Sequence, residues 1–228
     1  MSSNVKETKT YFDSNPKHFK DAIEEYPIMY REAAKGINKY IKGNVLDVGS
    51  GGVINYNTNK LKNLFLADIA SANKERAKNN IFFLNGDIRN LGIKKNSMDC
   101  VVIQHLLHHL ADNTLKKSLQ NLEKSIKEIH NTLKEGGTIL IIEGLVPLPF
   151  DLLQRSLFSI NKQVYKKLFN FPMVLQYSER KIIKEIKKSG FKLEHIETIK
   201  DGNVLPIFGM NIPRKFVPLK HKFIVARK

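Results

Sequence analysis

Hydrophobic residues form short, almost unbroken runs along this chain, separated by longer stretches with a helical period or many turn residues. The runs cover residues 45–48, 64–67, 81–84, 100–103 and 138–142. Runs of this length predict strands that are buried on both faces, as in a parallel sheet covered by helices. The pattern therefore predicts an α/β fold with helices on both faces of the sheet.

Helical periodicity precedes the first run and separates the fourth from the fifth. Apolar residues recur at three- and four-residue steps from Ile23 to Ile41, with an interruption at Pro27. Proline suits the first turn of a helix, so we expect a short helix, a break just before Pro27 and a longer helix to Ile41. A second apolar stripe predicts a helix over Leu115–Leu133.

The last third of the chain repeats the alternation after a long insertion. Its periodicity predicts a helix over 178–189 and strands over 191–199 and 221–226. Together the segments predict one α/β domain at 44–228, preceded by an N-terminal helical arm at 1–43. Within that domain, residues 146–177 form a helical insertion after the fifth strand.

The chain is strongly basic, with 38 Lys+Arg against 22 Asp+Glu and a net charge of +16. Residues 151–228 hold 17 basic and 6 acidic residues, so +11 of that charge lies there. Such an excess is compatible with nucleic acid, an anionic membrane or an acidic substrate. It is mainly lysine in a chain rich in Asn and Ile, which is also typical of an AT-rich genome.

Composition excludes several classes of protein. The single cysteine, Cys100, forms no internal disulfide and no Cys-rich zinc site, which favours a reducing compartment. The polar first ten residues do not resemble a signal peptide, and no apolar run is long enough to span a membrane. We therefore expect a cytoplasmic protein.

Residues that could bind a ligand or take part in a reaction stand at the end of each predicted strand. They are Asp47, Gly49 and Gly51 after the first, Asp68 after the second, Asp87 after the third, Gln104 and His105 after the fourth, and Glu143 after the fifth. In open α/β sheets, ligands bind beyond the carboxyl ends of the strands. An acid at the end of the second strand is placed to accept hydrogen bonds from the hydroxyls of a ribose.

Five stretches of the sequence resemble the class I S-adenosylmethionine-dependent methyltransferases. They are Val45–Gly52, Leu66–Ile69, Asn85–Ile88, Met98–Leu110 and Leu133–Gly137. The resemblance implies a Rossmann-like sheet of seven mostly parallel strands, in which the last two strands supply a reversed hairpin at one edge. It also implies an enzyme whose cofactor is S-adenosylmethionine.

The same resemblance assigns residues to the cofactor. Gly49, Ser50 and Gly51 would lie against its methionine part, beside Asp47, and Gln104 would contact its amino acid end. Asp68 would hold the ribose hydroxyls, while Ile69, Asp87 and Ile88 would surround the adenine. The sequence departs from the family at Val53, where a third glycine is usual.

Methyl transfer requires alignment of the acceptor and, for a hydroxyl or a protonated amine, a base. His105 and His109 are the candidate catalytic residues, and Tyr11, His108, Glu143 and Phe158 are the candidate substrate contacts. The alternative is that the histidines pack beneath a helix as an ordinary part of the family's sequence. Three histidines also suggest a metal, but the sequence shows no clear carboxylate partner or spacing, so no metal site is predicted.

The insertion at 146–177 combines apolar residues at helical spacing with basic residues. It is interpreted as a lid over a small acceptor, as a peripheral contact with an anionic membrane, or as a cap or dimer face. The leading function is methyl transfer to an oxygen or nitrogen of a small, partly apolar metabolite, such as a specialised metabolite. The alternatives are a tRNA methyltransferase that uses the basic last third, and a cofactor-binding protein with a different or lost reaction.

Overall fold

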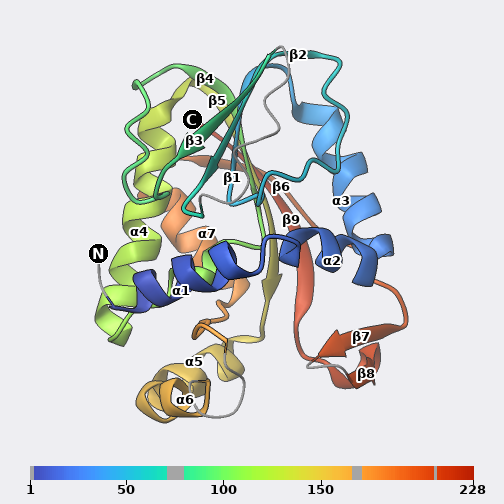
Figure 1. The fold of residues 1–228 in the computed structure, drawn as a ribbon, viewed down its shortest axis with the longest axis vertical. Helices are drawn as coiled ribbons and strands as arrows, with labels where there is room; N and C mark the ends of the chain where they lie inside the picture. Colours follow the sequence, from blue (N-terminus) through green and yellow to red (C-terminus); the bar gives the residue numbers. More distant parts are fainter. Residues whose placement is uncertain (1–2, 71–79, 166–170, 208–209) are drawn as a thin grey trace.

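The computed structural model describes residues 3–70, 80–165, 171–207 and 210–228 and is built around a seven-stranded sheet (Figure 1). The strands, in spatial order, are β3 (Ile81–Asn85), β2 (Leu61–Asp68), β1 (Gly43–Val48), β4 (Met98–Gln104), β5 (Leu133–Leu145), β9 (Lys220–Arg227) and β6 (Lys192–Thr198). The first five are parallel, whereas β9 runs antiparallel to both of its neighbours. The predicted Rossmann-like sheet with a reversed hairpin at one edge is confirmed.

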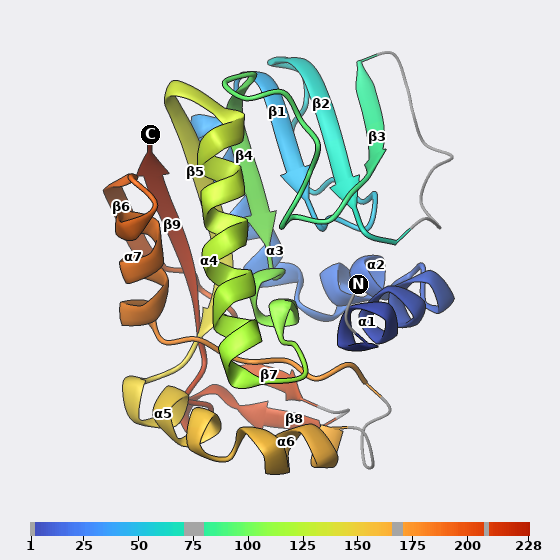
Figure 2. The same cartoon turned by 90° about the vertical axis from the view of Figure 1, so that its left-hand side faces the viewer.

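Helices cover both faces of the sheet, as its apolar strands require. On one face, α4 (Leu115–Thr132) and α7 (Glu179–Lys188) pack against side chains such as Val101 and Ile141 (Figure 2). On the other face, α3 (Pro27–Tyr40) packs against the residues that alternate with these, such as Val102. Each central strand is therefore buried on both sides, which explains its continuous apolar run.

Two short helices, α1 (Ser3–Ser14) and α2 (His18–Glu25), lie across the carboxyl ends of β1, β2 and β3 (Figure 2). The break before Pro27 is confirmed, because this proline takes the first position of α3. The side-chain amide of Asn4 is buried and donates to the carbonyl of Ala111 at 2.6 Å. This bond fastens the start of the chain to the loop that follows β4.

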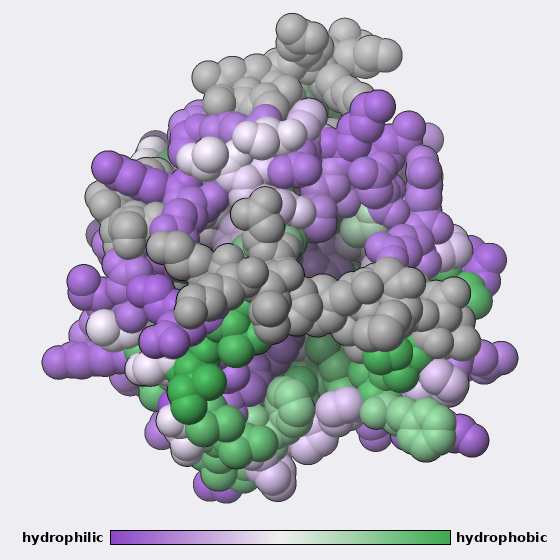
Figure 3. All heavy atoms as spheres, turned by 60° about the horizontal axis from the view of Figure 1, so that its bottom comes forward, coloured by the Kyte–Doolittle hydropathy of each residue, from purple (hydrophilic) through white to green (hydrophobic). Residues whose placement is uncertain are grey.

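The insertion after β5 is helical, as predicted, and contains α5 (Leu148–Ser156) and α6 (Phe158–Val164). These helices lie at the end of the molecule that is turned toward the viewer in Figure 3, where exposed apolar side chains gather. Parts of the insertion, at 166–170, lie outside the described residues.

A small hairpin near the C-terminus is absent from the sequence prediction. Strands β7 (Val204–Ile207) and β8 (Met210–Pro213) pair with each other and join neither edge of the main sheet. Pro206 and Pro213 argue against strands in the sequence, since proline donates no ladder hydrogen bond. A two-stranded hairpin has a free outer edge on each strand, which removes that objection.

None of the helices described in the structure has the length and apolar character that crossing a membrane requires.

Candidate functional site

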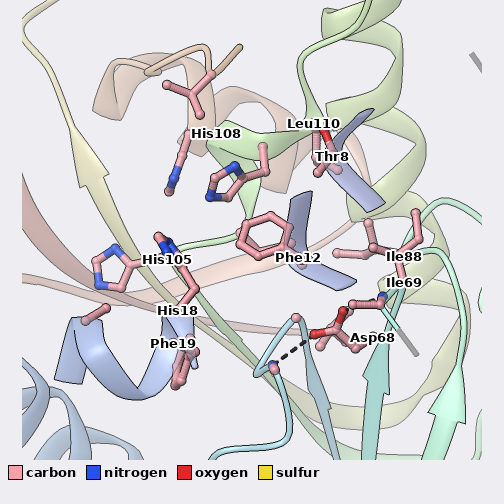
Figure 4. Close-up of a pocket in the computed structure, with 18 of the residues that line it drawn as sticks. Thr8, Phe12, His18, Phe19, Asp68, Ile69, Ile88, His105, His108 and Leu110 are labelled. Carbon is pink, nitrogen blue, oxygen red and sulfur yellow. Dashed lines mark hydrogen bonds between the residues drawn. The ribbon is translucent and has the colours of Figure 1, made fainter. Parts of the chain in front are cut away.

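A cavity of about 480 Å³ opens at the carboxyl ends of the parallel strands, beneath α1 and α2. Its walls are mostly apolar, and residues from the N-terminal helices, the strand ends and the segment after α6 contribute to them. Figure 4 shows Asp68, Ile69 and Ile88 at one side of this space and His105 and His108 at the other. The cavity thus joins two chemically different ends.

Asp68 defines the first end. One carboxylate oxygen accepts the backbone N–H of Gly51 at 2.9 Å (Figure 4). The other oxygen accepts the backbone N–H of Ala70 at 2.8 Å. Burial raises the pKa of Asp68, and these backbone hydrogen bonds oppose the shift. The N–H of Ile69 also acts on this carboxylate. A carboxylate has about four acceptor sites, so Asp68 can still accept a hydrogen bond from a ligand in the cavity.

The turn after β1 brings its backbone close to this carboxylate. Gly49 and Gly51 have φ values of +79° and +56°, in the region that favours glycine. A Cβ atom on Gly49 would lie 2.8 Å from the side chain of Leu106. Both glycines line the cavity, so the turn leaves a backbone wall where a side chain would intrude.

Asp87 also lines the cavity, but its carboxylate already has a partner. Both of its oxygens accept hydrogen bonds from the guanidinium of Arg89, with Nε at 2.7 and 3.0 Å. Burial would raise the pKa of Asp87, but the Arg89 hydrogen bonds and charge outweigh it and lower that pKa. Ile88 is buried in the core on the α4 side and also lines the cavity.

The second end of the cavity is rich in histidine. Five of the seven histidines of the chain line it, namely His18, His105, His108, His109 and His221. Among the residues that the structure describes, no three His, Cys, Asp or Glu side chains are arranged to hold a metal ion. The chemistry of each ring therefore depends on its own neighbours.

His108 is paired with a buried carboxylate. Its Nδ1 lies 2.7 Å from Oε1 of Glu143, which is 1% exposed and also accepts the N–H groups of Leu107 and Gly144. Burial would raise the pKa of Glu143, but His108 and the other donors outweigh it and lower that pKa. An ionised Glu143 fixes the proton of a neutral His108 on Nδ1 and leaves Nε2 as an acceptor.

His105 and His109 have no carboxylate at hydrogen-bond distance among the described residues, although Nδ1 of His105 lies 4.0 Å from Oε1 of Glu143. Burial lowers the pKa of His105 to about 3, and the nearby His221 adds to this shift. The backbone of His105 has a φ of +50°. Burial also lowers the pKa of His109, whose Nδ1 has no hydrogen-bond partner among the described residues. Both rings are therefore neutral near pH 7, and they pack against other rings: His105 on Tyr30 at 5.6 Å and His109 on Phe12 at 5.2 Å.

A second histidine–carboxylate pair is absent from the sequence prediction. Nδ1 of His221 lies 2.8 Å from Asp201, which also accepts a hydrogen bond from Arg214 at 2.8 Å. His221 lines the cavity because β9 runs beside β5, and His221 stands opposite Gly144 of β5 in this strand pair. Asp201 and Arg214 lie on the connection between β6 and β9, and His221 lies on β9, so the path of this connection brings the three residues together.

Several residues predicted for the site lie outside the cavity wall. Asp47 is fully buried and accepts the hydroxyl of Tyr56 at 2.7 Å, and Gln104 pairs with the amide of Asn55. Phe158 packs in the core on the α4 side. The remaining two are Ser50, which is buried in the turn, and Tyr11, whose ring packs on Phe171 at 4.8 Å. The other predicted residues (Gly49, Gly51, Asp68, Ile69, Asp87, Ile88, His105, His108, His109 and Glu143) line the cavity.

Comparison with known proteins identifies this arrangement. Residues 46–141 match the family model described as a methyltransferase domain. The matched segment thus resembles a methyltransferase domain, and the fold around it is the Rossmann-like fold of S-adenosylmethionine-dependent methyltransferases. No curated protein matches this methyltransferase in sequence.

Solved structures with low sequence identity share its fold. One is a complex between the Haloferax volcanii Trm112 methyltransferase activator and a protein described as a methyltransferase (TM-score 0.69, 14% identity, covering 96% of each chain). Another is 1,6-didemethyltoxoflavin-N1-methyltransferase of Burkholderia thailandensis, with bound 1,6-didemethyltoxoflavin and S-adenosylhomocysteine. Its TM-score is 0.66 at 14% identity, and the match covers 96% of this chain and 86% of that chain. A third is geranyl diphosphate C-methyltransferase of Streptomyces coelicolor A3(2), in complex with Mg²⁺, geranyl diphosphate and S-adenosylhomocysteine. Its TM-score is 0.65 at 12% identity, and the match covers 92% of this chain and 84% of that chain.

The residues of the first end of the cavity fit S-adenosylmethionine, the methyl donor of this family. Asp68 offers its remaining acceptor site to a diol, and Ile69 and Ile88 offer apolar surface to a flat base. The open turn at Gly49 leaves room beside the backbone. When bound, the cofactor supplies an activated methyl group, and the protein's task is to hold the acceptor in line with it.

Proposed function

We propose that this methyltransferase acts on an oxygen or nitrogen of a small, partly apolar molecule held at the histidine-rich end of the cavity. The observation that carries the proposal is the single cavity that runs from Asp68 to His108 and Glu143. Its volume of about 480 Å³ lies in the range of pockets for small molecules.

The composition of the wall supports the choice of acceptor. Side chains such as Phe12, Phe19, Met29 and Phe171 give the cavity an apolar surface. At the end away from Asp68, polar groups converge where the two histidine–carboxylate pairs lie. A ligand with an apolar body and one polar, methyl-accepting group matches this distribution.

Within this proposal, His108 is the base. Glu143 holds the Nδ1 proton, so Nε2 can take the proton of an acceptor hydroxyl as its oxygen is methylated. For an ammonium acceptor, Nε2 would take the proton first, which frees the nitrogen lone pair that attacks the methyl group. The sequence alone favoured His105 and His109 for this role, but burial makes them weak bases. They serve better as neutral walls around the acceptor.

The proposed acceptor class is tested by incubating the enzyme with S-adenosylmethionine carrying a labelled methyl group. One reaction receives a small-metabolite extract and a parallel one receives total RNA. We expect label in the metabolite fraction, because the site is an enclosed apolar cavity. Label in RNA alone would reject the proposal and favour a tRNA methyltransferase that uses the basic last third of the chain.

A further inference from the structure

Helix α5 is oriented against the usual rule for a helix on a protein surface. Its one carboxylate, on Asp151, is fully buried. Its neighbours Leu152 and Leu153 are 52% and 55% exposed. The helix therefore turns its charged group inward and its leucines outward.

The buried carboxylate fixes this orientation. Asp151 accepts two hydrogen bonds from Arg155, at 2.6 and 2.8 Å. It also accepts the N–H and the hydroxyl of Ser178, at 3.0 and 2.6 Å. Arg155 lies on the same helix, so rotating α5 to bury its leucines would keep this ion pair but break both hydrogen bonds to Ser178. The buried N–H and hydroxyl of Ser178 would then lose their acceptor, which is unfavourable.

The exposed apolar surface extends beyond these two leucines. We define the insertion face as seven side chains that are 36–59% exposed: Leu148, Phe150, Leu152, Leu153, Leu157, Ile160 and Val164. They lie on consecutive helices at one end of the molecule (Figures 2 and 3). Seven of the ten exposed large apolar side chains among the described residues gather here, and such a concentration marks an interaction site.

Charge indicates what covers the insertion face. Asp151 is the only acidic residue between 146 and 178, and it is buried. Residues 151–228 carry +11 of the net charge of +16. Two copies of a chain with this charge repel each other, whereas an anionic bilayer attracts it.

We propose that the insertion face docks this protein on the surface of an anionic lipid bilayer. Helices α5 and α6 have nine and seven residues, so they would lie in the interface with their apolar side chains among the lipids. The basic C-terminal part supplies the second, electrostatic attraction that stable peripheral binding requires. Tyr165, directly after α6, lines the cavity, so docking brings the acceptor end close to the bilayer.

Flotation of the full chain with lipid vesicles tests this proposal. One set of vesicles contains phosphatidylcholine alone, and the other contains about one-third phosphatidylglycerol, a common anionic lipid. We expect the protein to float with the anionic vesicles only, and to do so less as salt is added. The measurement needs neither cofactor nor acceptor, so it succeeds or fails independently of the proposed methyl transfer.

Matched variants test whether vesicle binding depends on the insertion face or on any exposed apolar side chain. Leu152→Glu/Leu153→Glu is expected to lower vesicle binding by roughly tenfold or more, since each change removes a leucine from the lipid and adds a negative charge. Ile160→Glu on α6, at 59% exposure, should act in the same direction. Phe82→Glu is the control, because Phe82 is 43% exposed on β3, away from α5 and α6. Circular dichroism melting checks that each variant folds.

Three outcomes would overturn the proposal. The first is equal flotation with both kinds of vesicle. The second is flotation of the double variant at the wild-type level. The third is no flotation together with a dimer by mass in solution that becomes a monomer in the double variant, which would assign the insertion face to a second copy of the chain.

Discussion

At the scale of residues, the two ends of the cavity differ in how their carboxylates are used. Asp68 keeps a free acceptor site toward the cavity, whereas Glu143 is committed to His108 and to backbone donors. A carboxylate with a spare acceptor site can bind a ligand directly. A committed one acts through the side chain that it orients, as in a histidine–carboxylate pair.

The role of His108 is tested by His108→Asn, which keeps an N–H donor for Glu143 but provides no base. We expect transfer to a hydroxyl or amine acceptor to fall by about 10²- to 10⁴-fold, with unchanged affinity for S-adenosylmethionine. Turnover and cofactor titration are measured in parallel. The control is His195→Asn, because His195 is 45% exposed on β6, outside the cavity. Equal losses in both variants would argue against a base at this position.

Asp68→Ala is expected to weaken S-adenosylmethionine binding by roughly 10- to 100-fold, the effect of losing hydrogen bonds to a charged group. Asp87→Ala should have a smaller effect, because Arg89 already occupies both oxygens of Asp87. Calorimetric titration of both variants makes the comparison. An affinity that Asp68→Ala leaves intact would remove Asp68 from the cofactor site.

Asp47 gives a prediction for stability against pH. Burial raises its pKa from 3.8 to about 7, and Oδ1 has no partner among the described residues. Between these values the folded state binds the proton more tightly than the unfolded state, so stability falls as pH rises toward 7. Each pKa unit corresponds to about 1.4 kcal/mol. Asp47→Asn should therefore stabilise the protein by up to about 4 kcal/mol at pH 8, and by less at pH 5, in urea unfolding measured at both values.

Sequence reasoning found the residues of the cavity that stand at strand ends, because topology alone places them. Asp68 ends β2, Asp87 follows β3 and Glu143 lies near the end of β5, so the three residues meet at one edge of the sheet. It did not find the partners of those residues. Arg89 beside Asp87 and Asp201 beside His221 depend on side-chain directions and on the C-terminal hairpin, which periodicity does not encode.

At the scale of elements, the turn after β1 depends on glycine for two separate reasons. Gly49 has a positive φ, and a Cβ there would meet Leu106. Gly92 also has a positive φ, of +65°, but no described atom lies within 4 Å of its missing Cβ. Comparing substitutions at Gly49 and Gly92 therefore distinguishes the cost of backbone strain from the cost of a steric clash.

We expect Gly92→Ala to destabilise the protein by about 1–2 kcal/mol, the cost of the left-handed conformation for an L-residue. Gly49→Ala should cost a further 1–3 kcal/mol or so, because Leu106 must also move. Urea unfolding gives both values. Equal costs would show that the turn relaxes around the added methyl group.

The elements themselves were predicted well where the period was clear. The strands of the sheet, α3, α4 and α7 were found because one apolar pattern fits each of them. The β7–β8 hairpin was missed because it is short and contains Pro206 and Pro213. Phe158 was assigned to the substrate from its neighbours in sequence, but the bend before α6 turns it into the core.

At the scale of the whole molecule, charge and chemistry occupy different regions. The cofactor end of the cavity is built from residues 49–88, whereas most of the positive charge lies beyond residue 150. The structure adds to this division an exposed apolar end carried by α5 and α6. The proposed bilayer contact and the proposed methyl transfer therefore use separate surfaces and can be tested separately.

The position of Cys100 has a practical consequence for an enzyme whose acceptor is not known. This thiol is 1% exposed at the centre of the sheet, and burial raises its pKa far above the usual value. A thiol reagent can reach Cys100 only when the sheet opens, so the rate of labelling reports how often the sheet opens. A ligand that binds the folded state reduces those events in proportion to its occupancy. The chain thus contains its own reporter, with which cofactors and candidate acceptors can be ranked before any product is detected.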